Sequence, residues 1–161
     1  MGRVKAVLAV SVALAVSLSS AAPARVTAQD AERSVRPLLD SMLIAANAHD
    51  TERFMRYYAR TPDLVFVFNG RVIQGFDSLY AQQLIWWNHG RSDVVYRYEG
   101  DPVFTTLGND SGSVVVTTRM TATRAGAAGT AVTGGVAVMM VWRRRPEGWR
   151  IVAGHESTAR P

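Results

Sequence analysis

The end of the chain constrains the fold most, because two apolar runs there flank one short turn. The segment from Gly134 to Ser157 reads GGVAVMMVWRRRPEGWRIVAGHES. Within it, the residues Arg-Pro-Glu-Gly at 145–148 suit a type I turn, with proline at the second position and glycine at the fourth. We therefore expect a β-hairpin in which Arg144 faces Trp149 across the turn.

This register also decides which side chains share a face, because successive side chains on a strand point to opposite faces. It pairs Trp142 with Ile151 and Val138 with His155. One face is then mainly apolar and contains Met140, Trp142, Trp149, Ile151 and His155. The opposite face contains Arg143, Arg150 and Glu156. We expect the rest of the protein to cover the apolar face, whose single titratable group is His155.

The first 28 residues have the organisation of a secretory signal peptide. Arg3 and Lys5 give a basic start, and Ala6–Leu18 is an uninterrupted run of apolar and small residues. A membrane anchor is the alternative, but the run is shorter than the about 20 residues that span a bilayer. The sequence therefore favours cleavage over anchoring.

The small residues at Ala24 and Ala28 are the two candidate cleavage sites. Cleavage would leave residues 29–161 as one domain, located in the periplasm or outside the cell and without a stable membrane anchor. Removing three basic residues and no acid lowers the formal net charge from +5 to +2. The charge therefore does not indicate a nucleic-acid partner. The chain contains no cysteine, which excludes a disulfide framework.

The part of the chain that follows predicts an α+β fold. Apolar residues recur at helical spacing over 35–46, 54–58 and 79–87, and Pro37 is tolerable only if it falls in the first turn of the first helix. A small hairpin around Asn69-Gly70 separates the second helix from the third. Four antiparallel strands follow, at about 93–107, 113–124, 132–144 and 149–157. Helices before a meander of strands imply three helices packed on one face of a curved antiparallel sheet.

Three phrases, in this order, resemble the SnoaL-like branch of the nuclear-transport-factor-2-like superfamily, which also contains ketosteroid isomerase and scytalone dehydratase. They are AANAHDTERFMRYYA from Ala45, FNGRVIQGFDSLY from Phe68, and VWRRRPEGWRIVAGHES from Val141. The resemblance covers about residues 31–158 and is strongest with short secreted members of undefined function. It implies a cone-shaped, cystatin-like domain with a pocket between helices and sheet. It also implies a homodimer formed through the sheet, and a small apolar ligand bound without cofactor.

The resemblance does not extend to the catalytic residues of ketosteroid isomerase. Met42 stands where that family has a tyrosine that donates to the oxyanion, and Val67 or Phe68 stands near its aspartate base. The strand expected at 113–124 contains no acid where the third residue would fall. Enolisation needs a base within reach of the proton and donors aimed at the developing oxyanion. We therefore do not expect steroid-isomerase chemistry.

His155 is the candidate catalytic residue, because imidazole titrates near neutral pH. The structural alternative is a histidine at the edge of the core, bonded to backbone or to a tyrosine. Glu156 is interpreted as facing outward, and His49 and His89 match no metal-binding spacing. The other residues expected to line the pocket are Met42, Tyr58, Trp86, Tyr96, Tyr98, Met140, Trp142, Ile151 and Ser157.

These observations predict an exported domain that binds a small hydrophobic molecule without catalysing a reaction. Two alternatives stay open. One is an isomerase, dehydratase or hydrolase that uses His155 and needs no metal or cofactor. The other is a module whose only role is dimerisation, through the sheet face that contains Arg143, Arg150 and Glu156.

Overall fold

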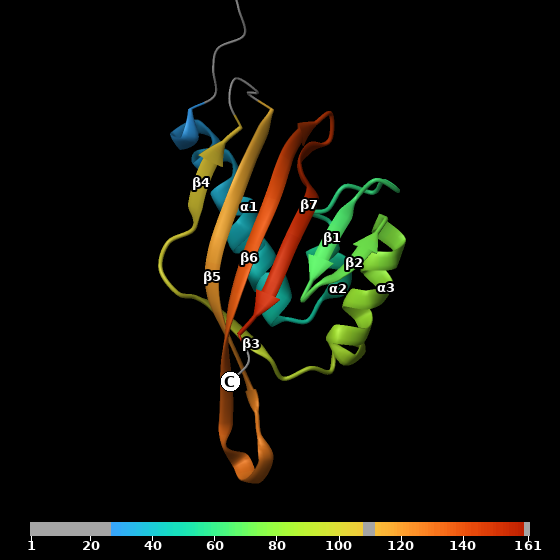
Figure 1. Ribbon diagram of the computed structural model, residues 1–161, viewed down its shortest axis with the longest axis vertical. Coiled ribbons are helices and arrows are strands. Elements are labelled where there is room, and N and C mark those ends of the chain that lie inside the picture. Colours follow the sequence, from blue (N-terminus) through green and yellow to red (C-terminus); the bar gives the residue numbers. More distant parts are fainter. Residues whose placement is uncertain (1–26, 108–111, 160–161) are drawn as a thin grey trace, which may run out of the picture.

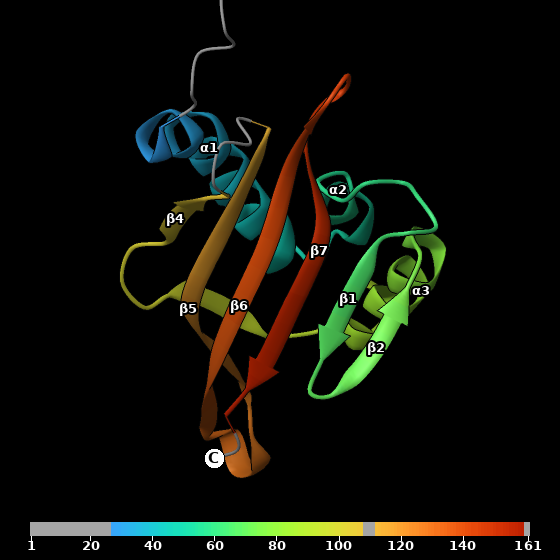
Figure 2. The ribbon, with the colours of Figure 1, turned by 45° about the horizontal axis from the view of Figure 1, so that its top comes forward.

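The computed structural model describes residues 27–107 and 112–159. The helices α1 (Ala28–Asn47), α2 (Thr51–Met55) and α3 (Phe76–Trp86) lie on one side of a seven-stranded sheet (Figures 1 and 2). Two single 3-10 turns are also present. The turn η1 (Asn88–Gly90) follows α3, and η2 (Ala127–Gly129) lies between the strands β5 (Ser113–Ala125) and β6 (Ala131–Arg145). None of the described helices is long and apolar enough to cross a membrane.

The start of α1 is fixed by a capping box. The Thr27 hydroxyl accepts from the backbone N–H of Asp30, and the Asp30 carboxylate accepts from the backbone N–H of Thr27. The expectation that Pro37 falls in the first turn is therefore wrong, because it lies in the helix interior. Pro37 is exposed, so water can replace the helical hydrogen bond that its missing N–H removes.

The predicted signal peptide lies outside the described residues, except for Thr27 and Ala28.

The sheet is mixed rather than purely antiparallel. Its order is β2-β1-β7-β6-β5-β3, and β4 also pairs with β5. The small predicted hairpin joins this sheet because β1 pairs with β7 in parallel. The strands are β1 (Val65–Phe68), β2 (Arg71–Gln74), β3 (Val95–Tyr98), β4 (Val103–Thr106), β5 (Ser113–Ala125), β6 (Ala131–Arg145) and β7 (Gly148–Thr158).

The strand expected at 93–107 is divided into two. Both β3 and β4 pair antiparallel with β5, and the chain between them turns at Gly100, whose φ is +86°. Pro102 follows before β4 begins and has no N–H for the ladder. The break bends the chain so that β3 and β4 pair with different parts of β5.

The closing hairpin keeps its predicted register only near the turn. Arg144 pairs with Trp149 and Trp142 pairs with Ile151, as expected. A β-bulge then leaves Val152 without a partner, because Val141 pairs with Ala153. One extra residue moves every later side chain on β7 to the opposite face.

The predicted pair of Val138 with His155 is consequently wrong. Val138 pairs with Glu156, and Met139 pairs with His155. His155 is exposed and Glu156 is half-buried. The bulge thus exchanges the two side chains, so that the expected inward histidine faces outward and the expected outward glutamate faces the helices.

The core lies between the helices and the concave side of β5, β6 and β7. Its fully buried side chains include Val35 on α1 and Trp142 and Ile151 on the hairpin. Gly154 has a specific role at the edge of this core. A Cβ atom there would lie 2.8 Å from two ring carbons of its β1 partner, Phe66. Glycine therefore lets the Phe66 ring lie flat against β7.

Replacing Gly154 by alanine should destabilise the protein by about 1–3 kcal/mol, because the Phe66 ring must leave its position. Urea unfolding at equilibrium measures this change. Gly135→Ala is the matched control, since a Cβ at Gly135 would lie 3.7 Å from Ala159 in ordinary contact. Equal effects of the two substitutions would contradict the proposed role of Gly154.

Candidate functional site

A cavity of about 390 Å³ lies between the helices and the concave face of the sheet. This volume falls within the range of about 300–1,000 Å³ that is usual for small-molecule sites. Side chains of α1, α3 and the segment 54–58 form one wall, and side chains of β1, β3, β5, β6 and β7 form the other. The cavity is open to solvent on one side, with Asp93 and Arg124 among its lining residues.

Strand pairing arranges the sheet wall in rows. One row runs across four strands and consists of Phe68, Glu156, Val138 and Thr118, all of which line the cavity. A neighbouring row consists of Phe66, Gly154, Met140 and Val116, and the row on the other side consists of Thr158, Val136, Met120 and Tyr98. The Glu156 carboxyl therefore emerges between largely apolar rows.

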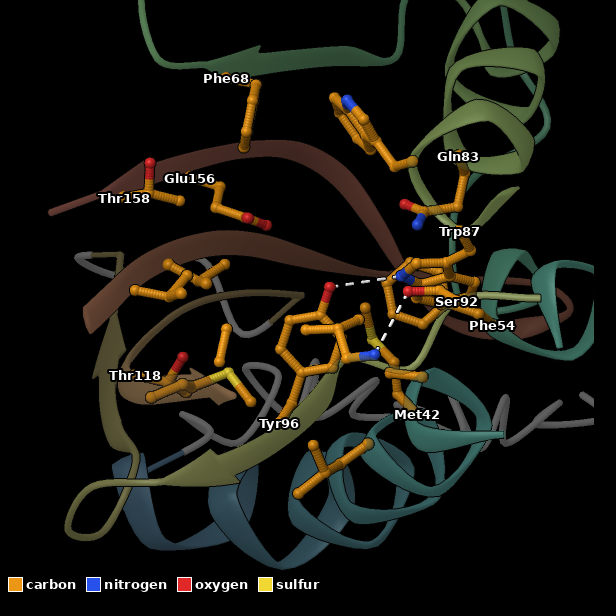
Figure 3. A pocket seen from close by; sticks show the side chains of 18 of the residues that line it. Met42, Phe54, Phe68, Gln83, Trp87, Ser92, Tyr96, Thr118, Glu156 and Thr158 are labelled. Carbon is orange, nitrogen blue, oxygen red and sulfur yellow. Dashed lines mark hydrogen bonds between the residues drawn. The ribbon is translucent and has the colours of Figure 1, made fainter. Parts of the chain in front are cut away.

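Aromatic rings line much of the cavity, both from the helix wall and from Phe68 on β1. The rings of Phe68 and Trp86 lie 4.7 Å apart between centroids, and those of Phe54 and Trp87 lie 4.8 Å apart. The indole N–H of Trp87 donates to the Tyr96 hydroxyl at 3.3 Å (Figure 3). These contacts fix the orientation of the rings that line the cavity.

The Glu156 carboxyl projects into the cavity (Figure 3). Burial raises its pKa from 4.5 to about 7, because the apolar surroundings disfavour the charged form. Within residues 27–107 and 112–159, no hydrogen bond or ion pair reaches this carboxyl. The group therefore changes between acid and carboxylate near neutral pH.

Apart from Asp93 and Arg124, the remaining polar groups of the cavity are neutral donors and acceptors. Burial, together with the charge of Glu156, raises the pKa of the Tyr58 and Tyr96 phenols, so both stay protonated. The buried Thr118 hydroxyl has no partner among the described residues, and it lies in the same row as Glu156. Two strand spacings separate the two residues, which places their Cα atoms roughly 10 Å apart. The Gln83 amide also points into the cavity (Figure 3).

Comparison with protein families identifies this architecture. The model of the SnoaL-like domain matches residues 27–154. The chain belongs to the SnoaL-like domain family. A comparison with curated proteins gives no match.

Solved structures share the fold of this SnoaL-like domain at low sequence identity. An NTF2-like superfamily protein from Salmonella enterica serovar Typhimurium has a TM-score of 0.68 at 16% identity, covering 84% of this chain and 95% of that one. A proposed dehydratase of the NTF2-like family from Streptomyces avermitilis has a TM-score of 0.67 at 17% identity, and the match covers 84% of this chain and 100% of that one. An NTF2-like protein with a cystatin-like fold from Novosphingobium aromaticivorans has a TM-score of 0.64 at 18% identity, and the match covers 78% of this chain and 80% of that one. The predicted family resemblance and fold class are confirmed.

The SnoaL-like domain brings together only part of the predicted site. Trp142 and Ile151 are buried in the core and do not line the cavity, and Ser157 and His155 lie on the other face of β7. His155 and Ser157 point away from the cavity because the bulge at Val152 reverses the alternation of β7. The residues that do line the cavity as expected are Met42, Tyr58, Trp86, Tyr96, Tyr98 and Met140.

Glu156 lines the cavity, although the sequence analysis placed it on the opposite face. Its neighbours offered one weak signal, the adjacent apolar pair Ile151-Val152, which interrupts strict alternation.

Among the described residues, no group of three histidines or acids could hold a metal ion. His49 is engaged elsewhere, since its Nε2 atom lies 2.8 Å from the Val94 carbonyl oxygen.

The raised pKa of Glu156 predicts a pH-dependent stability. The folded state binds the proton of Glu156 more tightly than the unfolded state, so the contribution of this residue to stability is most favourable below about pH 4.5 and falls as pH rises towards about 7. The shift corresponds to at most about 3 kcal/mol. Glutamine cannot ionise, so Glu156→Gln should gain stability relative to the wild type between about pH 5 and about pH 8.

Urea unfolding of both proteins at the two pH values measures this gain. Glu147→Gln is the control, because Glu147 lies in the exposed turn between β6 and β7. If both substitutions change stability with pH in the same way, Glu156 does not carry the effect.

Proposed function

We propose that this SnoaL-like domain binds a small, largely apolar molecule in the cavity between helices and sheet. The observation that carries this proposal is that the cavity remains open. The large side chains of Trp86 and Met140 line it without filling it. A chain that needed only a core or a dimer face could close this space and gain the burial of that apolar surface.

The walls suit a ligand of about two fused rings. Phe68 and Trp86 contribute aromatic surface to the lining, and Val138 and Met140 contribute aliphatic surface. Burial of the ligand's apolar surface contributes roughly 25 cal/mol per Å² before the costs of association are subtracted. Orientation then depends on the few polar groups, chiefly Glu156, Thr118 and Gln83.

A second function, proton transfer within the bound molecule, is favoured by the state of Glu156. A general base works best when its pKa lies near the working pH, and burial brings this carboxyl to about 7. The carboxylate would take a proton from the carbon beside a carbonyl group and return it at another position. The neutral hydroxyls of Tyr58 and Thr118 would donate to the oxygen that becomes negative. The similar fold of a proposed dehydratase is consistent with such chemistry.

Export and a homodimer formed through the sheet stay predictions from the sequence. The outer face of the hairpin differs from the expected one, because the bulge replaces Glu156 with His155 beside Met139. Met139 is 44% exposed there.

Ligand binding can be tested with N-phenylnaphthylamine, a neutral fluorophore whose emission rises in apolar sites. We expect saturable binding to the wild type, weakened about 2- to 10-fold in Trp86→Ala by loss of an aromatic wall. Ile85→Ala is the matched control, because the neighbouring Ile85 is 64% exposed and does not line the cavity. Absence of saturable binding to the wild type would contradict the proposal.

Proton transfer can be tested by deuterium uptake from heavy water at the carbon beside the carbonyl of tetralone, followed by NMR. The wild type should accelerate this exchange about 100-fold or more over Glu156→Gln, which lacks the base. Equal exchange rates in the two proteins at saturating tetralone would remove Glu156 as the base and leave binding as the function.

A further inference from the structure

We propose that the ligand of this cavity carries one basic amine, held as an ammonium group against the Glu156 carboxylate and the rings of Phe68 and Trp86. The inference rests on the proposed ligand-binding function and adds the chemical class of the ligand. Three features of the cavity lead to it: an uncompensated acid, an aromatic corner beside that acid, and apolar walls elsewhere.

The acid of the cavity has no cationic partner in the described part of the chain. The Glu156 carboxyl takes part in no ion pair or hydrogen bond there. Arg124 also lines the cavity but is exposed, and it does not contribute to the charge state of Glu156. The second acid, Asp93, already accepts from the backbone N–H of Ala125 at 2.7 Å. A buried carboxylate without a partner is costly, so a ligand that brings its own cation removes a penalty that a neutral ligand leaves.

The aromatic corner lies directly beside this carboxyl. Phe68 on β1 is the strand partner of Glu156 on β7, and both side chains project into the same part of the cavity (Figure 3). The Trp86 ring packs on Phe68 with an interplanar angle of 47°. An alkylammonium within about 6 Å of ring faces is attracted to them, and a carboxylate at the same place adds a charge-assisted hydrogen bond. This combination distinguishes an amine from a hydroxyl group, which can donate a hydrogen bond but has no positive charge to pair with the carboxylate or to be attracted to the rings.

The two rows beside Glu156 contain no charged side chain that could pair with a second charge on the ligand. The apolar side chains of these rows include Met140, Val136 and Met120. An acidic ligand would meet repulsion from Glu156 and find no cation on these rows. The predicted ligand is therefore a monoamine with an apolar body.

Amine binding must be linked to the proton of Glu156. The ammonium favours the carboxylate, so binding near pH 7 releases the proton that the free protein holds there. The other titratable groups of the lining are the phenols of Tyr58, Tyr96 and Tyr98, with Asp93 and Arg124. Burial raises the pKa of all three phenols, so they keep their protons. His155 lies on the opposite face of β7.

Calorimetric titration with three matched probes tests this inference on the purified protein: naphthylmethylamine, the neutral naphthylmethanol and the anionic naphthoate. At about pH 7.5 the wild type should bind the amine about tenfold or more tightly than the alcohol, and naphthoate most weakly. Glu156→Gln should lose most of the preference for the amine, because only the attraction to the rings remains, while keeping the affinity for the alcohol. Arg124→Gln is the control and should keep the preference for the amine.

The outcomes separate the two proposals. Equal binding of amine and alcohol by the wild type overturns the amine inference and leaves ligand binding in place, whereas binding of none of the probes overturns both. A preference for the amine that is undiminished in Glu156→Gln also overturns the inference. Titration of the wild type in two buffers of different ionisation enthalpy provides a measurement that needs no variant. About half a proton should be released per bound amine near pH 7, and no release would contradict the assignment to Glu156.

Discussion

The register of β7 depends on one unpaired residue, Val152. Before it, the strand follows the alternation set by the turn, and Trp149 and Ile151 enter the core. After it, the alternation is reversed, and Gly154 and Glu156 face the helices. The parallel strand β1 pairs with this second part, which brings Phe66 over Gly154 and Phe68 beside Glu156. The bulge therefore sets both the packing at the edge of the core and the chemistry of the cavity.

The cavity combines features that a purely structural core would avoid. Its volume of about 390 Å³ is left open, a carboxyl stands among apolar rows, and the buried Thr118 hydroxyl lacks a partner among the described residues. Each of these lowers the stability of the folded state. Departures of this kind are expected where a protein uses a site, because a ligand can supply the missing contacts. The same physical features support both ligand binding and proton transfer.

Local sequence patterns predicted the parts of the fold that depend on local geometry. The turn at 145–148, the pairs next to it and the small hairpin around Asn69-Gly70 follow from residue types with narrow conformational preferences. Six residues of the cavity lining were predicted as well, because they lie on strands and helices whose apolar face was clear.

Non-local features were out of reach of the same reasoning. The bulge has no strict sequence signature. Side-chain alternation extended from the turn therefore assigned His155 and Glu156 to the wrong faces of β7. The parallel pairing of β1 with β7 joins segments about 90 residues apart, and no local pattern reports it. Pro37 lies inside α1 because a capping box upstream starts the helix earlier than the apolar pattern does. In each case a tertiary or upstream contact overrode the local preference.

The most direct test of this account is the ionisation of Glu156 itself. The carboxyl carbon of this residue can be followed by NMR as a function of pH, and assigned by its absence in Glu156→Gln. A carboxyl placed in the cavity by the bulge should titrate with a pKa of about 7. Titration near the ordinary value of 4.5 would show that the carboxyl lies in water, which would contradict the register described for β7.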